Sequence, residues 1–141
     1  MNIVVVDDDA CVLHLLSCVL CRKGHTVRTY DNPLMCPLYT APACSCYLES
    51  DCPDVIISDV DMPDVDGVSF VEAVFNKQCK CKYIALFSGK TLSDQNRTRA
   101  DTMGVRFFTK PLDFAELEAW MLHAPLALSN VGPEYSIEVS R

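Results

Sequence analysis

Hydrophobic residues alternate between two patterns along most of this chain. Short runs rich in β-branched or aromatic residues, bounded by turn formers or charges, are typical of strands. They predict strands at residues 2–7, 25–30, 54–59, 82–88 and 105–109. Apolar residues spaced three or four positions apart predict helices at 9–23, at 67–77 and after an N-cap at Asp113. The polar segment 93–103 is assigned as a further helix because it ends at Gly104, a usual residue just past a helix end.

The segment from residue 31 to 53 breaks this regular pattern. Pro33, Pro37 and Pro42 interrupt it, and proline is poorly tolerated inside a helix. We therefore predict a long loop in which only residues 43–50 form a short helix.

Strands that alternate with helices at this spacing indicate a parallel sheet with right-handed crossovers and helices on both faces. The nearly continuous apolar runs at 3–6 and 55–57 fit strands that are buried on both sides. The sequence thus predicts an α/β fold with a doubly wound five-stranded parallel sheet. We expect this domain to occupy residues 1–123, followed by a C-terminal tail at 124–141 that is too short for an output domain.

Chain length and net charge limit the classes of function that are possible. A chain of 141 residues is sufficient for one domain, and its net charge of −7 disfavours direct binding to nucleic acid. The N-terminus lacks the basic and long apolar regions of a signal peptide, and no apolar run reaches the 18 to 20 or so residues that span a bilayer. We expect a cytoplasmic protein without a membrane segment.

Charged and polar residues follow the predicted strands at their carboxyl ends. They are Asp7 and Asp8, Asp59, Ser88 and Lys110. In a parallel sheet these ends share one edge, where open α/β sheets bind their ligands. Three carboxylates that meet there repel one another unless cations neutralise them, and Mg²⁺ together with the lysine would do so. Such a site suits phosphoryl transfer.

Four motifs in this order resemble a known family. They are VVVDDD (4–9), PDVIISDVDMPDVDG (53–67), IALFSG (84–89) and FFTKP (107–111). Over residues 2–122 the chain resembles the CheY-like receiver domain of two-component response regulators. The resemblance implies a flavodoxin-like strand order, 2-1-3-4-5, and a phosphoprotein of phosphorelay signal transduction. Such a switch is not an enzyme, since it catalyses only its own phosphorylation and dephosphorylation.

The resemblance also implies a role for each site residue. Asp59 would be the phosphoacceptor, taking its phosphoryl group from a sensor histidine kinase or a phosphotransfer protein. Asp8, Asp59 and the backbone carbonyl of Asp61 would bind Mg²⁺ directly, and Asp7 would act through water. Lys110 would pair with Asp59 and then with the phosphoryl oxygens. Ser88 and Phe107 stand at the two switch positions, although a phenylalanine lacks the hydroxyl that tyrosine would offer there.

Two further features concern the lifetime and the readout of the phosphorylated state. Asp61 and Lys90 carry opposite charges at positions where the family tunes hydrolysis, and we predict that they approach across the mouth of the site. A downstream protein, or a second copy of the chain, would dock on the face of the fourth helix, fifth strand and fifth helix. The charged residues that this face offers are Arg97, Arg99, Asp101, Arg106 and Glu116.

Other interpretations compete with this one. Asp7, Asp8 and Asp9 could simply cap the first helix, although one aspartate suffices for a cap. The pair Asp59 and Asp61 also suggests a phosphatase of the haloacid dehalogenase type, but that family places its pair on the first strand. The chain could also be a receiver-like interaction module that is never phosphorylated, which the intact set of site residues argues against.

Nine cysteines are unusual for a chain of this length. Cys44, Cys46, Cys52, Cys79 and Cys81 flank the third and fourth predicted strands, so we expect them to gather at the end of the sheet opposite the aspartates. Four thiolates could bind zinc. Without a sign of export, reduced thiols are the alternative that the sequence favours over disulfides, and all three states remain open.

Overall fold

The computed structural model of the chain describes residues 1–44, 52–81 and 83–123. They belong to two compact units, Met1–Lys110 and Pro111–Arg141. The first unit contains the whole sheet. The described part of the second unit contains a helix at 114–123, whose first turn is capped by the Asp113 carboxylate, which accepts hydrogen bonds from the amides of Ala115 at 2.9 Å and Glu116 at 3.2 Å.

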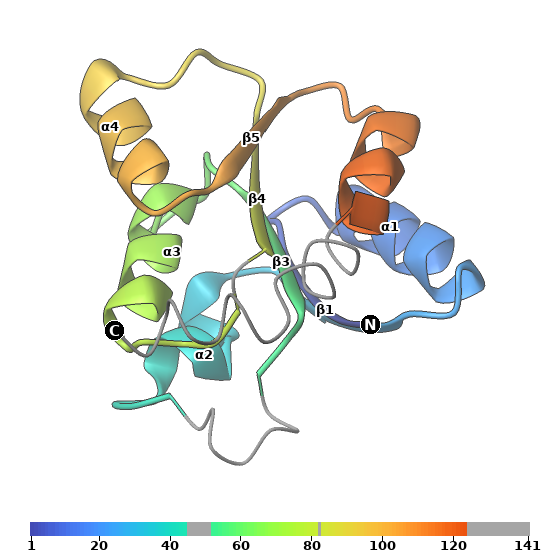
Figure 1. Cartoon of the computed structure of the whole chain (residues 1–141), viewed down its shortest axis with the longest axis horizontal. Helices are drawn as coiled ribbons and strands as arrows, with labels where there is room; N and C mark the ends of the chain where they lie inside the picture. The colour runs from blue at the N-terminus through green and yellow to red at the C-terminus, as the bar shows by residue number, and fades with distance from the viewer. Residues whose placement is uncertain (45–51, 82, 124–141) are drawn as a thin grey trace, which may run out of the picture. The chain divides into compact units, whose positions relative to one another are not determined.

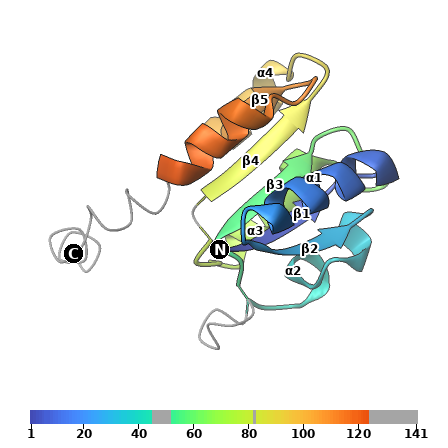
Figure 2. The ribbon, with the colours of Figure 1, turned by 90° about the vertical axis from the view of Figure 1, so that its right-hand side faces the viewer.

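The first unit is built on a five-stranded parallel sheet. Its strands are β1 (Asn2–Val6), β2 (Thr26–Tyr30), β3 (Val55–Asp59), β4 (Tyr83–Ser88) and β5 (Arg106–Thr109). The strand order is β2-β1-β3-β4-β5, and every neighbouring pair is parallel. Figure 2 shows the strands β2, β1, β3 and β4 side by side. The predicted fold class and strand order are confirmed.

Helices cover both faces of this sheet. α1 (Ala10–Arg22) lies on one face, and α3 (Gly67–Asn76) and α4 (Asp94–Thr102) lie on the other, together with the short α2 (Figure 1). Each of these three longer helices begins after a side chain that caps it, as the sequence favours. The caps are Asp9, Asp66 and Ser93.

The proline-rich segment differs from its prediction as a loop. A 3₁₀ turn, η1 (Pro33–Met35), and the one-turn helix α2 (Pro37–Thr40) both begin at a proline. Proline is well tolerated in the first turn of a helix, where its missing amide would have no partner, so these prolines start helical turns instead of preventing them. Most of the short helix predicted at 43–50 lies outside the described residues.

The core holds the strand ends in fixed positions. β3 is buried along its whole length, and Val68, Phe70 and Val71 of α3 are fully buried against it and its neighbours. Burying a side chain of this size contributes about 1.5 to 3 kcal/mol. The carboxyl ends of β1 and β3 therefore emerge from a rigid layer.

Candidate functional site

Two buried carboxylates lie at the carboxyl ends of neighbouring strands. Asp7 follows β1 and is 2% exposed, and Asp59 ends β3 and is 4% exposed. The exposed Asp8 completes the group, because one carboxylate oxygen from each of the three aspartates lies within 4.8 Å of the others. The convergence that strand topology predicted is therefore present.

The three consecutive aspartates that follow β1 have different local contacts. The Asp7 amide donates to the Tyr30 carbonyl at 3.1 Å, and one Asp7 carboxylate oxygen accepts from the Asp9 amide at 2.9 Å. Asp9 caps α1 by accepting from the Cys11 amide at 2.9 Å. A role in capping accounts for Asp9 alone, which leaves Asp8 and the second oxygen of Asp7 to face Asp59.

Lys110 supplies the cation of the site. Its ammonium lies 2.9 Å from Asp59 Oδ1 and 3.6 Å from Asp7 Oδ2. The backbone positions it, because the Lys110 amide donates to the Ser88 carbonyl at 2.9 Å and thereby continues the pairing of β4 with β5. The side chain is one third exposed, so it reaches the carboxylates from the rim.

Burial dominates the electrostatics of the two carboxylates. It raises the pKa of Asp59, against the lowering effect of Lys110, and the nearby Asp8 and Asp61 raise it further. Burial likewise raises the pKa of Asp7, and the hydrogen bond from the Asp9 amide only partly offsets it. The pKa of Lys110 is raised although its burial acts in the other direction, since Asp59 and Asp7 stabilise the ammonium. One lysine does not compensate this cluster fully.

The donor set fits a hard divalent cation. Asp59 Oδ1 is buried, and no donor among the described residues makes a well-aligned hydrogen bond to it, since Lys110 approaches it as an ion pair. Carboxylate oxygens that converge in this way are the ligands that Mg²⁺ takes in proteins, usually one or two at a time with several waters. Asp59 thus offers a ligand atom, and its negative charge is not fully compensated by Lys110.

The loop after β3 fixes the backbone of Asp59. The Gly67 amide donates to the Val60 carbonyl at 2.9 Å, and the Ser58 hydroxyl donates to the Asp59 carbonyl at 2.9 Å. A Cβ on Gly67 would overlap the Asp59 carbonyl oxygen, so only glycine fits at this helix start. Sequence reasoning used this glycine as part of a motif and missed its role in positioning Asp59.

Ser88, Asp61 and Lys90 are connected at the end of β4. The buried Ser88 hydroxyl donates to Asp61 Oδ2 at 3.0 Å and accepts from the Lys90 amide at 3.1 Å. The contact between Ser88 and Asp61 was not anticipated from the sequence, because it joins the buried end of β4 to the exposed loop after β3 through one hydroxyl. The effect of Asp61 and Lys90 on hydrolysis stays a prediction.

Phe107 lies in the middle of β5, opposite Leu86 of β4, and is half-buried against the core. The Arg97 guanidinium of α4 lies 5.9 Å from its ring centroid. α4 is also joined to α3, since Arg99 makes a two-pronged ion pair with Glu72 at 2.9 and 3.0 Å. Arg99 therefore has a partner within the fold, and its role in docking stays a prediction.

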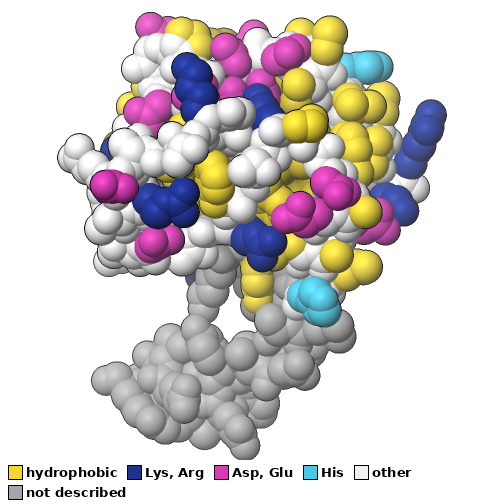
Figure 3. Space-filling view, turned by 90° about the horizontal axis from the view of Figure 1, so that it is seen from above, with side chains coloured by type: hydrophobic (Ala, Val, Ile, Leu, Met, Phe, Trp, Pro, Cys, Tyr) yellow, Lys and Arg dark blue, Asp and Glu magenta, His cyan; other side chains and the backbone are white. Residues whose placement is uncertain are grey.

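The surface seen from above mixes acidic, basic and hydrophobic side chains (Figure 3). On this face, basic side chains lie between the acidic ones. Within the described ranges, no helix is both long and apolar enough to cross a membrane.

Comparison with known proteins identifies the family. Residues 3–121 match the sequence profile described as the response regulator receiver domain. The transcriptional regulatory protein KdpE of Staphylococcus aureus is 27% identical over 118 residues, which are 84% of this chain and 47% of that protein. The DNA-binding transcriptional regulator NtrC of Azospirillum brasilense is 29% identical over 116 residues, 82% of this chain and 22% of that protein. The chain spans half or less of the length of these curated relatives.

Solved structures agree with these matches. The chemotaxis protein CheY4 of Vibrio cholerae is 26% identical and superposes with a TM-score of 0.68 over 87% of this chain and 97% of that one. A CheY-like response regulator receiver domain protein of Methanospirillum hungatei is 16% identical and shares the fold, with a TM-score of 0.76 over 93% of this chain and 98% of that one. The chain belongs to the response regulator receiver domain family of two-component signalling.

Proposed function

We propose that this chain is a phosphoacceptor switch of a two-component phosphorelay, phosphorylated on Asp59 by a histidine of a sensor kinase or phosphotransfer protein. The observation that carries this proposal is the environment of Asp59. Its carboxylate lies at the end of β3 with Lys110 at 2.9 Å and with Asp7 and Asp8 within 4.8 Å. A carboxylate can act as a nucleophile toward phosphorus when cations screen the approaching oxygens.

The transfer conserves atoms and charge. An Asp59 oxygen forms a bond to phosphorus while the bond between phosphorus and the histidine nitrogen breaks. The imidazole leaves with the bonding electron pair and takes a proton from solvent. Little acid or base catalysis by the protein is needed, since positioning and electrostatic stabilisation supply most of the rate in phosphoryl transfer.

The residues proposed to hold Mg²⁺ are Asp8, Asp59 and the backbone carbonyl of Asp61, with Asp7 acting through water. When bound, the ion supplies positive charge that stabilises the phosphoryl oxygens in the transition state. Lys110 already lies beside Asp59 and needs only a small side-chain motion to contact the incoming oxygens. Burial raises the pKa of Asp59 against the lowering effect of Lys110, which fits a site that binds a second cation.

The change of state is proposed to start at Ser88. Its hydroxyl donates to Asp61 in the structure, and a phosphoryl oxygen on Asp59 is a stronger acceptor for the same proton. When Ser88 turns to that oxygen, Asp61 loses its hydrogen bond, and the Lys90 amide loses its acceptor or moves with it. The loop after β4 then shifts, and the half-buried Phe107 fills the space that the shift opens.

The switch is stoichiometric: the chain catalyses only its own phosphorylation and hydrolysis, and Asp61 and Lys90 tune the second step. We place it in the cytoplasm, with the receiver domain at residues 1–123 and a tail at 124–141. Readout would go through a downstream protein or a homodimer that contacts the α4 and β5 surface, where Arg97 and Arg106 are exposed. The predicted contribution of the helix at 114–123 to that surface stays a prediction.

A small phosphodonor tests the proposal. The full chain is incubated with Mg²⁺ and acetyl phosphate, and the intact mass is followed over time. We expect a transient gain of one phosphoryl group that Asp59→Asn abolishes and Asp64→Asn retains. Asp64 is a matched control because it is an exposed aspartate of the same loop, and its positive φ of 67° is well tolerated by asparagine. No gain in the wild type would favour the unphosphorylated interaction module, and sustained release of phosphate from unrelated phosphoesters would favour a phosphatase.

A further inference from the structure

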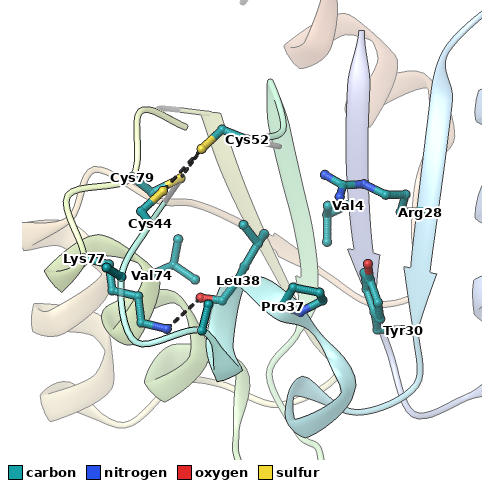
Figure 4. A pocket seen from close by; sticks show the side chains of 12 residues that line it. Val4, Arg28, Tyr30, Pro37, Leu38, Cys44, Cys52, Val74, Lys77 and Cys79 are labelled. Atoms are coloured by element: carbon teal, nitrogen blue, oxygen red, sulfur yellow. Dashed lines mark hydrogen bonds between the residues drawn. The ribbon is translucent and has the colours of Figure 1, made fainter. Parts of the chain in front are cut away.

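Three cysteine sulfurs meet at the end of the sheet opposite the aspartates. Cys44 Sγ lies 3.3 Å from Cys52 Sγ, which lies 3.7 Å from Cys79 Sγ, and all three fall within 4.8 Å of one another. Figure 4 shows the three side chains pointing toward one another. They come from three different segments, since Cys44 follows α2, Cys52 precedes β3 and Cys79 follows α3.

The sulfurs border a pocket of about 280 Å³. Its wall includes all three cysteines, the apolar side chains of Leu38 and Val74, and the cationic side chains of Arg28 and Lys77. Lys77 is held in place by donating to the carbonyls of Leu38 at 2.9 Å and Tyr39 at 2.6 Å. The thiols are therefore half-buried beside a hollow, with fixed positive charge on the same wall.

The spacing of the sulfurs matches a metal better than a disulfide. A disulfide requires a sulfur separation of about 2.05 Å. Three thiolates on a tetrahedral metal at about 2.3 Å each stand about 3.8 Å apart, by the geometry of the tetrahedron. The observed 3.3 and 3.7 Å are close to that value, so one ion could contact all three sulfurs after small side-chain motions.

We propose that Cys44, Cys52 and Cys79 form a three-thiolate site for a soft metal ion of the Zn²⁺ class, with its fourth position open to the pocket. Soft thiolate ligands select Zn²⁺ and similar ions over the hard Mg²⁺ of the aspartate site. A zinc ion with three protein ligands keeps one position for water or a small donor. The site is independent of the proposed phosphorylation, because it lies at the other end of the sheet.

Two other cysteines help to define the ligands of the proposed site. Cys81 is buried and its sulfur faces the carbonyls of Asp54 at 3.6 Å and Tyr83 at 3.8 Å, so it is not one of the ligands. Cys21 is exposed on α1, far along the chain from the cluster, and serves as a control. Ligand thiols must lose their protons, so metal binding releases protons to the buffer.

Metal titration of the full chain tests the site. The chain is purified with a phosphine reductant and without chelator, and Co²⁺ or Zn²⁺ is added. We expect one equivalent bound, a sulfur-to-cobalt charge-transfer band in the near ultraviolet, and an X-ray absorption shell of three sulfurs at about 2.3 Å from zinc. Cys44→Ser, Cys52→Ser and Cys79→Ser should each weaken binding by about 100-fold or more, since the loss of even a supporting contact costs 10- to 100-fold. Cys21→Ser should bind as the wild type does.

Three results would overturn the proposal. One is the absence of Zn²⁺ binding at micromolar concentration by the reduced chain. Another is an X-ray absorption spectrum of the zinc-loaded wild type with fewer than three sulfur neighbours. This measurement is made on the wild type, so it holds even if a serine variant fails to fold. The third is a mass loss of two hydrogens that maps to Cys44 and Cys52 without metal uptake, which would identify an oxidisable thiol pair.

Discussion

Removing a charge from the buried cluster changes stability in a direction that depends on which charge is removed. In the metal-free chain, Lys110→Ala leaves two carboxylates that are at most 4% exposed without their cation. Asp59→Asn removes one of those carboxylates and leaves Lys110 with Asp7 as a partner at 3.6 Å. We expect the first change to destabilise the fold and the second to stabilise it.

The distances from Lys110 to the two carboxylates determine the size of the expected change in folding free energy. At an effective dielectric constant of about 20, opposite charges attract by about 6 kcal/mol at the 2.9 Å between Lys110 and Asp59 and by about 5 kcal/mol at the 3.6 Å between Lys110 and Asp7. Solvent at the one-third exposed ammonium screens much of this. Removing one partner of a buried pair costs about 3 to 5 kcal/mol, so we expect a loss of about 3 kcal/mol for Lys110→Ala.

The sign for Asp59→Asn follows from its raised pKa. Burial and carboxylate repulsion outweigh the attraction of Lys110, so the charged form costs folding energy. Lys110 keeps Asp7 as its partner at 3.6 Å, while the desolvation and repulsion of one carboxylate are removed, so we expect a gain of about 1 kcal/mol. Because the pKa of Asp59 is raised above 3.8, protonation of this group stabilises the folded wild type at low pH. That stabilisation is lost as the pH rises through the raised pKa. The advantage of the asparagine over the wild type should therefore be smaller at acidic pH than at neutral pH.

Urea unfolding followed by circular dichroism measures both variants in buffer with a chelator. With a slope of about 1 to 3 kcal/mol per molar urea, Lys110→Ala should lower the midpoint by about 1 M or more. Asp59→Asn should raise it by about 0.3 to 1 M at pH 7. An unchanged midpoint for Lys110→Ala, or an asparagine variant less stable than the wild type without metal, would show that Lys110 already balances the carboxylates of the cluster.

Four further predictions concern the same site. Mg²⁺ at ten times its dissociation constant should stabilise the wild type by about 1.4 kcal/mol in the urea assay, and Asp59→Asn should lose most of that gain. Gly67→Ala should destabilise by about 1 to 3 kcal/mol, since its Cβ overlaps the Asp59 carbonyl, and thermal unfolding would detect it; wild-type stability would contradict the close approach. Ser88→Ala should still gain a phosphoryl group in the mass assay. In NMR spectra, however, phosphorylation of this variant should no longer change the amide chemical shifts of the loop after β4. Asp61→Ala and Lys90→Ala should each change the phosphoryl lifetime, and a wild-type lifetime in both variants would contradict their proposed tuning role.

The sequence was sufficient to predict which residues meet at the site, because the sheet topology alone determines which strand ends lie together. Parallel strands end on one edge, so Asp7, Asp59, Ser88 and Lys110 were brought together once the strands were placed. Contacts that depend on side-chain rotamers or loop paths were not predictable. The hydrogen bond between Ser88 and Asp61 and the division of roles among three identical aspartates belong to this second kind.

The segment between β2 and β3 shows where local rules misled. Proline disrupts the interior of a helix but is favoured in its first turn, and Pro33 and Pro37 both occupy first turns. The cysteine cluster was partly predictable. Cys52 and Cys79 precede neighbouring strands and had to lie close together, whereas the direction of the buried Cys81 sulfur, toward backbone carbonyls, depends on a bend that the sequence does not specify.

The most direct test of the central claim is to map the phosphorylated residue itself. After reaction with Mg²⁺ and acetyl phosphate, the acyl phosphate is reduced with borohydride, and the digested chain is sequenced by mass spectrometry. We expect a single modified aspartate, Asp59, and no modification when Mg²⁺ is replaced by a chelator. Modification at another carboxylate, or an equal yield without the metal, would contradict it.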